Sequence, residues 1–149
     1  MSSTKISFNE VEVKIQNKKT NIKNWILEIS KEHNHTIKSL SYTFSNDAFL
    51  LKINQSYLNH DTLTDIITFD LGDETNNKKI EGDIYISLER IKENAKIHNA
   101  SYKEEELRVI IHGLLHLCGF EDKNDTDKRN MRVLEENAIA KFNAMFHVE

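Results

Sequence analysis

The segment from residue 107 to residue 117 constrains the fold of this chain more than any other part of the sequence. It is apolar almost all round, so a helix formed there must be buried inside a domain. Ser101 followed by Glu104 is a capping-box pattern, which predicts where the helix begins. Gly119 can adopt the left-handed conformation that commonly ends a helix. The sequence therefore predicts one buried helix that begins near Ser101 and ends before Gly119.

Two histidines interrupt the apolar surface of this helix. His112 and His116 are four residues apart, so both lie on one face. Burying two imidazoles costs free energy unless each has a partner, and a zinc ion would satisfy both. Past the turn at Gly119, the chain can bring the carboxylate of Asp122 to the same ion. We therefore predict one zinc ion per chain, with His112, His116 and Asp122 as its ligands.

Three protein ligands leave a fourth position for water, which is typical of a catalytic zinc site. Zinc lowers the pKa of that water to about 7, so the site predicts a hydrolase. The alternative is that His112 and His116 are core residues bonded to backbone carbonyls. The pattern HxxxHxxGxxD disfavours it, because it has the spacing of the metzincin peptidase signature with aspartate as the last ligand.

One position argues against a peptidase. The peptidase motif places a glutamate directly after the first histidine, where it serves as general base. That position is Gly113 in this chain. Either the zinc-bound hydroxide attacks without such a base, or another acid, Glu121 or Asp83, supplies the proton transfer.

Length and composition restrict the number of domains, the cellular compartment and the kind of RNA contact that can be expected. A chain of 149 residues is the size of one domain, residues 1–149, and its single cysteine excludes an internal disulfide, which favours a reducing compartment. The formal net charge of −4 shows no basic excess, so any RNA contact must rest on a local patch. No signal-peptide stretch and no membrane-spanning run is present. A soluble cytoplasmic protein is expected.

Hydrophobic periodicity predicts an α+β domain with one small sheet. Strand-like alternation is followed by two helical patterns and further short strands, and the C-terminal half is helical, with a packed amphipathic helix from residue 128 to residue 146. The expected elements are a strand or hairpin over 6–15, a helix over 20–33, a strand over 40–44, a short helix capped at 46–47, strands at 66–69 and 84–86, a turn over 72–79, and helices from 88 onward with breaks near 99 and after 119.

Three sequence blocks resemble one known family. Residues 112–122, HGLLHLCGFED, are similar to the signature H-G-x-L-H-L-x-G-Y-D-H of the YbeY family of bacterial endoribonucleases. Residues 54–69, NQSYLNHDTLTDIITF, resemble the family's L-N-x-x-Y-R-x-K-D-x-P-T-D-V-L-S-F block, and Gly82-Asp83-Ile84 matches its G-D-I strand. The blocks occur in family order and cover nearly the whole chain.

The resemblance implies a zincin-like α+β fold with a four-stranded mixed sheet. It also implies zinc-dependent hydrolysis of single-stranded RNA, in maturation of the 3′ end of small-subunit ribosomal RNA and in ribosome quality control. The implied partners are ribosomal RNA and the small ribosomal subunit or its proteins, with neither a membrane nor DNA. Asp83 would lie near the metal, although a turn aspartate that caps backbone amides is an equally good interpretation.

Two departures from the family pattern bear on mechanism. Asp122 stands where the family has histidine, which makes the site less positive and its bound water slightly less acidic. Leu58 stands where the family has an arginine that faces the phosphate, and His60 replaces a nearby lysine. A leucine cannot stabilise developing negative charge, so His60, Lys103, Arg108 or another cation would have to do so.

Two other functions remain open from the sequence. One is a metallopeptidase or other zinc hydrolase, and the other is a ribosome-assembly binding module whose zinc is structural. No catalytic or metal-binding role is expected of the remaining polar candidates. Thr64 and Asp65 are expected to be structural, Cys118 to lie in the core and His98 to be solvated.

Overall fold

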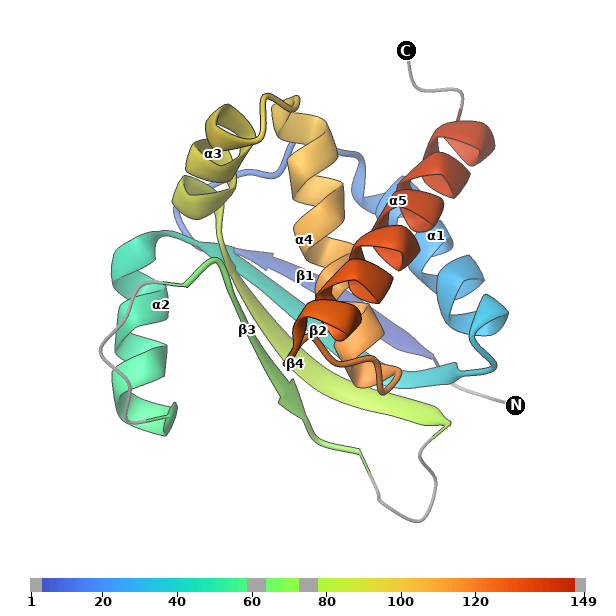
Figure 1. Cartoon of the computed structure of the whole chain (residues 1–149). Helices are drawn as coiled ribbons and strands as arrows, with labels where there is room; N and C mark the ends of the chain where they lie inside the picture. Colours follow the sequence, from blue (N-terminus) through green and yellow to red (C-terminus); the bar gives the residue numbers. More distant parts are fainter. Residues whose placement is uncertain (1–3, 59–63, 73–77, 147–149) are drawn as a thin grey trace.

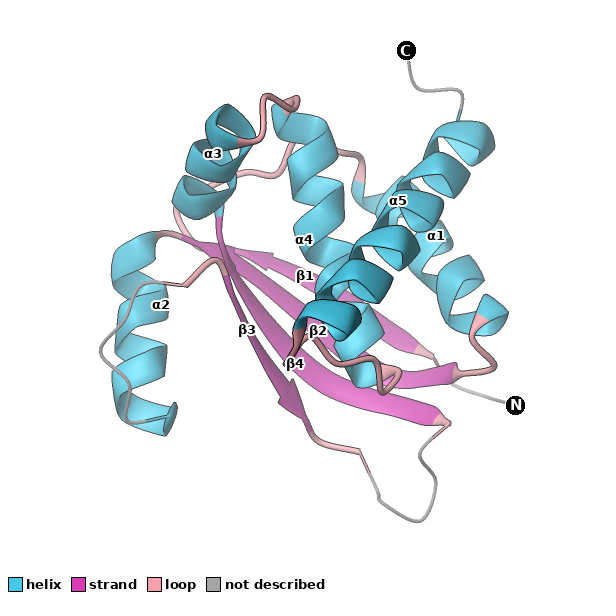
Figure 2. Ribbon diagram, viewed as in Figure 1, coloured by secondary structure: helices cyan, strands magenta, loops and turns pink. Residues whose placement is uncertain are grey.

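The computed structural model describes residues 4–58, 64–72 and 78–146. Within them, one mixed sheet has the strand order β1 (Lys5–Glu10), β2 (Thr36–Ser45), β4 (Lys79–Ser87) and β3 (Ile66–Asp70). β1 and β2 are parallel, as are β2 and β4, whereas β3 pairs antiparallel with β4 at the sheet edge. The predicted α+β class and four-stranded mixed sheet are confirmed (Figure 2).

The helices divide between the two faces of this sheet. α1 (Lys19–Glu32), α4 (Tyr102–Leu117) and α5 (Asp125–Phe146) cover one face, and α3 (Leu88–Ile97) packs beside α4 (Figure 1). α2 (Asp47–Ile53), continued by the π-helical turn η1 (Asn54–Leu58), packs on the other face, where Phe49 meets Tyr85 of β4. None of the described helices is long and apolar enough to cross a membrane.

The core lies between the sheet and the first group of helices, because side chains alternate in direction along each strand. In β2, Leu40, Tyr42 and Phe44 are almost fully buried, whereas Ser41 between them is partly exposed. The hydroxyl of Tyr42 donates a hydrogen bond to the backbone oxygen of Ile110 at 2.9 Å. This bond ties the middle strand of the sheet to the middle of α4.

α4 is the buried helix that the sequence predicts. The side chain of Ser101 accepts a hydrogen bond from the backbone N–H of Glu104 at 3.1 Å, which caps the first turn. Gly119 follows the last turn with a φ of 99°, a conformation that favours glycine. Both predicted ends of the helix are therefore confirmed.

Of the strand or hairpin predicted over 6–15, the strand is confirmed for residues 6–10, because β1 pairs in parallel with β2, and the hairpin alternative is wrong. β1 ends at Glu10, and Glu12 has a φ of 61°, which interrupts extended backbone. The N–H of Val11 still donates to the backbone oxygen of Phe44 in β2 at 2.8 Å, but the N–H of Ile15 donates to the carboxylate of Glu10 at 2.9 Å. Alternating apolar residues over this segment therefore belong to a loop that packs its side chains against the core.

The C-terminal helix and the predicted breaks are confirmed. Met131, Ala138 and Phe142 of α5 are buried, and the indole N–H of Trp25 in α1 donates to the backbone oxygen of Ala138 at 2.7 Å. Asn99, with a φ of 51°, separates α3 from α4. The turn expected over 72–79 lies mostly outside the described residues.

Candidate metal centre

Three donor atoms converge at the C-terminal end of α4. The Nε2 atoms of His112 and His116 are 2.9 Å apart. Asp122 brings its Oδ2 atom to 3.4 Å from the first and 3.5 Å from the second. Ligand atoms bound at about 2.0–2.1 Å around a tetrahedral zinc ion lie ~3.3 Å from one another. The donor set and its spacing therefore fit a zinc ion, and the three residues form a group able to hold a metal.

Each imidazole is also held at its other nitrogen. The Nδ1 atom of His112 lies 2.7 Å from Oε2 of Glu135, and that of His116 lies 2.9 Å from the backbone oxygen of Phe120. Both partners are acceptors, so each Nδ1 carries the proton and each Nε2 presents a lone pair to the common point. This arrangement is typical of metal-binding histidines.

Glu135 comes from α5 and is 7% exposed. It lies one turn from Met131 and from Ala138 within the buried stripe of that helix. A guanidinium nitrogen of Arg108 is 3.9 Å from its second oxygen. Glu135 was missed by sequence reasoning, although a glutamate at a core-facing position of an amphipathic helix is a signal that could have identified it.

The charges around His112 change its protonation. Burial works most strongly against the charged imidazole, but the hydrogen bond and charge of Glu135, with Asp122 and Asp65, outweigh it and raise the pKa of His112 above its usual value. A proton therefore binds well where the metal would bind. Because a protonated imidazole cannot be a ligand, metal binding should release this proton.

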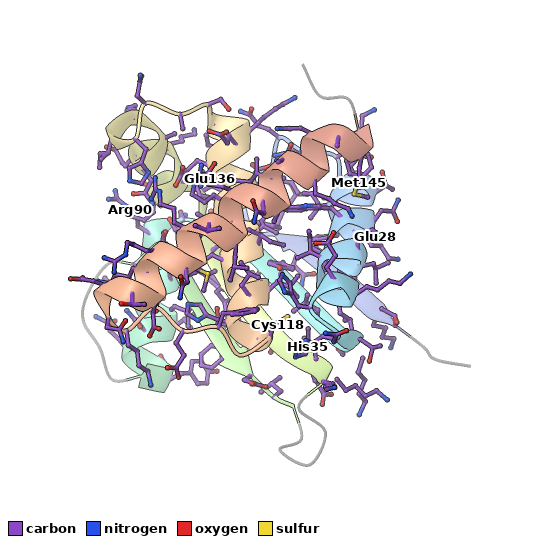
Figure 3. All side chains as sticks on the ribbon, turned by 45° about the vertical axis from the view of Figure 1, so that its right-hand side comes forward. Glu28, His35, Arg90, Cys118, Glu136 and Met145 are labelled. Carbon is purple, nitrogen blue, oxygen red and sulfur yellow. The ribbon has the colours of Figure 1, made fainter. Side chains whose placement is uncertain are left out.

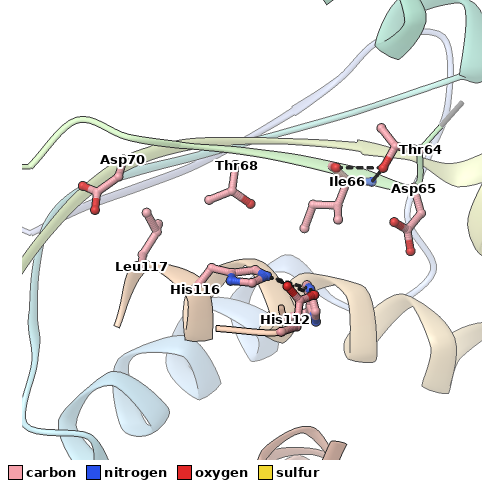
Figure 4. A pocket seen from close by; sticks show the side chains of 9 residues that line it. Thr64, Asp65, Ile66, Thr68, Asp70, His112, His116 and Leu117 are labelled. Atoms are coloured by element: carbon pink, nitrogen blue, oxygen red, sulfur yellow. Dashed lines mark hydrogen bonds and ion pairs between the residues drawn. The ribbon is translucent and has the colours of Figure 1, made fainter. Parts of the chain in front are cut away.

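A cavity of about 490 Å³ opens between β3 and the end of α4 (Figure 4). Side chains of β3 form one wall, and the two histidines lie on the opposite wall. The lining residues are Thr64, Asp65, Ile66, Thr68, Asp70, His112, His116, Leu117 and Asp122. Most of the polar groups in this cavity are hydroxyls and carboxylates, beside the candidate metal ligands.

Asp65 is the acid that the fold adds to the predicted set. Its side chain lines this cavity, and Asn94 donates to its Oδ2 atom at 3.3 Å. Burial raises the pKa of the Asp65 carboxyl, and the nearby charge of His112 only partly offsets this. The structural role expected from the sequence is also present, since the backbone oxygen of Asp65 accepts from the N–H of Ser87 at 3.0 Å.

Neither of the two acids that the sequence offers as proton-transfer groups belongs to the cluster of three donor atoms. Asp83 of β4 alternates with Gly82 and Ile84, which face α4, so its side chain lies on the opposite face of the sheet and does not join the three ligands. Glu121 borders a smaller cavity of about 230 Å³ that His116 and Asp122 also line. Its carboxylate is 3.3 Å from the ammonium of Lys123 and is mostly exposed.

Gly113 occupies the position of the peptidase glutamate, and its surroundings explain the choice. A Cβ atom there would lie 2.9 Å from Cδ1 of Ile84 and 3.0 Å from Cδ1 of Ile66. On the strand side, a Cβ on Gly82 would lie 2.8 Å from Cδ1 of Leu117. A side chain at position 113 would therefore have to push aside the ends of the Ile84 and Ile66 side chains, which pack against the helix there.

Comparison of the sequence with known proteins identifies the family of this chain. The family model described as "Endoribonuclease YbeY" matches residues 5–143. The chain belongs to the YbeY family. A protein of Flavobacterium psychrophilum called endoribonuclease YbeY is 46% identical over 97% of this chain and 98% of its own length. One of Christiangramia forsetii with the same name is 43% identical over 100% and 99%.

A solved structure has the same fold. The solution structure of a Thermotoga maritima protein superposes with a TM-score of 0.67 and covers 97% of this chain and 92% of its own. Its sequence is 23% identical, so this likeness concerns the fold. It supports the α+β architecture that the YbeY family resemblance implies.

The departures from the YbeY pattern can be placed in part. Leu58 is the last residue of η1 (Asn54–Leu58), and its side chain lies outside what the structure describes. His60 lies outside the described residues. Of the cations considered as substitutes, Arg108 is close to the metal ligands, but it contacts Glu135 and Glu136 and the Oε2 atom of Glu105 at 3.4 Å.

Proposed function

We propose that this chain is a zinc-dependent endoribonuclease that cuts single-stranded RNA. The observation that carries the proposal is the convergence of His112, His116 and Asp122, with both imidazoles anchored at Nδ1, in a chain whose relatives are called endoribonucleases. Hydrolysis of a phosphodiester needs an activated water and stabilisation of the charge that develops on phosphate.

The three ligands would hold one zinc ion and leave a fourth position for water. When bound, zinc supplies a nucleophilic hydroxide near neutral pH and polarises a phosphoryl oxygen. Glu135 holds His112 in the tautomer that binds metal. Asp65, whose carboxyl pKa is raised by burial, faces the same cavity and is the proposed group that accepts and returns a proton.

The cavity beside the ligands suits a flexible polar strand. The hydroxyls of Thr64 and Thr68 and the carboxylate of Asp70 line it. Such groups can hydrogen-bond to ribose hydroxyls and base edges, which are accessible in unpaired RNA. The proposed biological substrate is ribosomal RNA, in maturation of the small-subunit 3′ end and in ribosome quality control in the cytoplasm, with the small ribosomal subunit or its proteins as partners.

The test is cleavage of labelled single-stranded RNA by the purified protein, with and without a chelator. We expect cleavage that the chelator abolishes and that added zinc restores, and loss of cleavage in His116→Ala. Metal analysis should find about one zinc per chain, reduced in Asp122→Ala. Cleavage that is unaffected by both the chelator and His116→Ala would contradict the proposal.

A peptidase function is the weaker candidate, because Gly113 stands where that class has its glutamate base and packs closely against Ile84 and Ile66. Zinc-dependent cleavage of a peptide that His116→Ala abolishes would reverse this order. A ribosome-binding module with a structural zinc would instead retain ribosome association in His116→Ala while the wild-type protein shows no nuclease activity.

A further inference from the structure

Besides the cavity beside β3 and the smaller one at Glu121, a cavity of about 290 Å³ adjoins the candidate metal centre, and it is called the second cavity below. It lies between α3, α4 and the first half of α5, and it shares Asp65, His112 and Asp122 with the cavity beside β3. The two cavities therefore meet at the candidate metal ligands. A strand bound across those ligands would reach one cavity on each side of the bond that is cut.

The second cavity contains three residues that can carry positive charge: His98, Arg108 and Arg132. Two of them are already paired. His98 was expected to be solvated, but its Nδ1 atom is 3.5 Å from the buried carboxylate of Glu105. Arg108 contacts Glu105 at 3.4 Å and also Glu136, whose place on α5 is labelled in Figure 3.

Arg132 differs from both. It is exposed on α5, and its guanidinium has neither an ion pair nor a hydrogen bond with any residue in the described part of the chain. The nearest acid along the helix is Glu135, which is engaged with His112 and Arg108. An arginine with no partner among the described residues, at the border of a cavity that holds two of the candidate metal ligands, is available to an anion from outside the chain.

We propose that Arg132 binds a phosphate of the RNA strand, next to the one that is cut, and so defines a subsite in the second cavity. A guanidinium presents a planar fork of donors that matches the oxygens of a phosphate. This proposal rests on the proposed function, because that function supplies RNA as the substrate. The subsite also provides a cation beside the ligands in a chain that has a leucine, Leu58, where the family pattern has an arginine.

The experiment compares Arg132→Gln with wild type, using Arg129→Gln as the matched control. Arg129 is on the same helix and does not line the cavity, and within the described residues its guanidinium bonds only to the hydroxyl of Thr126, at 3.4 Å. We expect Arg132→Gln to raise KM for single-stranded RNA by about 10- to 100-fold, the effect of one charge-assisted contact. Arg132→Lys should restore part of the loss.

Salt dependence and metal content separate this role from a structural one. Losing one phosphate contact should make the slope of log affinity against log salt shallower by about 0.7. Zinc content and Tm should match those of wild type, because the side chain is exposed. Equal KM and equal salt slopes in Arg132→Gln and Arg129→Gln would overturn the inference while leaving the nuclease function intact.

If the wild-type protein does not cleave RNA, the nuclease proposal fails and the subsite is still tested by binding. Fluorescence anisotropy of labelled single-stranded RNA then replaces KM. Weaker binding by Arg132→Gln than by Arg129→Gln would support the subsite, and equal binding would overturn it.

Discussion

At the scale of single residues, the contact between Glu135 and His112 is the one most open to test. The carboxylate fixes the ring and makes it a better donor to metal. We expect Glu135→Gln to keep the fold but to weaken zinc binding by about 10- to 100-fold, the usual effect of losing such a partner. Competition with a chromophoric chelator measures this.

Glu136→Gln is the matched control for that measurement. Glu136 is the next residue on α5, is mostly exposed and contacts Arg108 without touching an imidazole. Its variant should bind zinc as wild type does. Equal weakening in both variants would show that general negative charge, rather than the bond to His112, determines the affinity.

Asp65 is the second residue whose role can be measured. If it moves the proton, Asp65→Asn should lower kcat for RNA by about 10²- to 10⁴-fold while zinc content stays unchanged. Because burial raises the pKa of this carboxyl, the active deprotonated form is lost as pH falls through a value above the ordinary aspartate range. The acidic limb of the wild-type kcat profile should reflect that pKa and disappear in the variant.

Asp70→Asn serves as the comparison, because Asp70 lines the same cavity from the same strand and its Oδ1 atom accepts from the N–H of Gly72 at 2.9 Å. Its kcat should stay close to that of wild type, because a contact between Asp70 and the strand would act on binding and therefore on KM. A kcat in Asp65→Asn close to that of Asp70→Asn would exclude proton transfer by Asp65.

At the scale of elements, one buried carboxylate joins the N-terminal loop to α4. Glu106 is fully buried and accepts from the backbone N–H groups of Gln16 and Asn17 at 3.0 Å and 2.9 Å, and from the side chain of Asn17 at 2.8 Å. Glu106→Ala would leave these donors unpaired in the interior. We expect the free energy of unfolding to fall by about 3 kcal/mol or more, measured by urea denaturation.

Two further variants sharpen that prediction. Glu106→Gln should cost less, because its amide oxygen can still accept part of the set. Glu104→Ala, in the first turn of the same helix, removes a partly exposed carboxylate that is 3.8 Å from Arg108, and should lower the free energy of unfolding by no more than about 1 kcal/mol. A loss in Glu106→Ala as small as in Glu104→Ala would show that the loop is not held by this carboxylate.

At the scale of the whole molecule, metal removal should lower stability without unfolding the chain. The apolar core consists of side chains other than the ligands, so the metal-free protein should keep its far-UV circular dichroism. Zinc at about 1,000 times its Kd adds roughly 4 kcal/mol to the folded state. For a chain of this size, a chelator should therefore lower Tm by roughly 10 °C.

That difference in Tm should shrink as pH falls. The raised pKa of His112 stabilises the metal-free protein at low pH, and this contribution is lost as pH rises through that pKa. The proton also competes with zinc for the same imidazole, so zinc binding weakens on the acidic side. Both effects bring the two Tm values together at pH 6 relative to pH 8. A constant difference would contradict the assignment of His112 as a ligand.

Local spacing in the sequence is sufficient to predict the three candidate ligands and the helix that carries two of them. Helix geometry places His112 and His116 on one face, and the turn at Gly119 returns the chain to Asp122, so only local spacing is involved. The α+β class also followed from periodicity. Alternation along the strand also predicts that Asp83 lies on the face of the sheet opposite to Ile84, and therefore away from the candidate ligands.

The groups that surround those ligands are brought there by the packing of α5 and β3, which is a property of the tertiary structure. Glu135 and Arg132 line the second cavity because α5 packs against α4, and Asp65 lines both cavities because it leads into β3, which pairs antiparallel with β4 at the sheet edge. Figures 1 and 3 show α5 lying across α4. These contacts join residues far apart in the chain. Their partners are selected by how whole elements pack, and no local spacing rule encodes that packing.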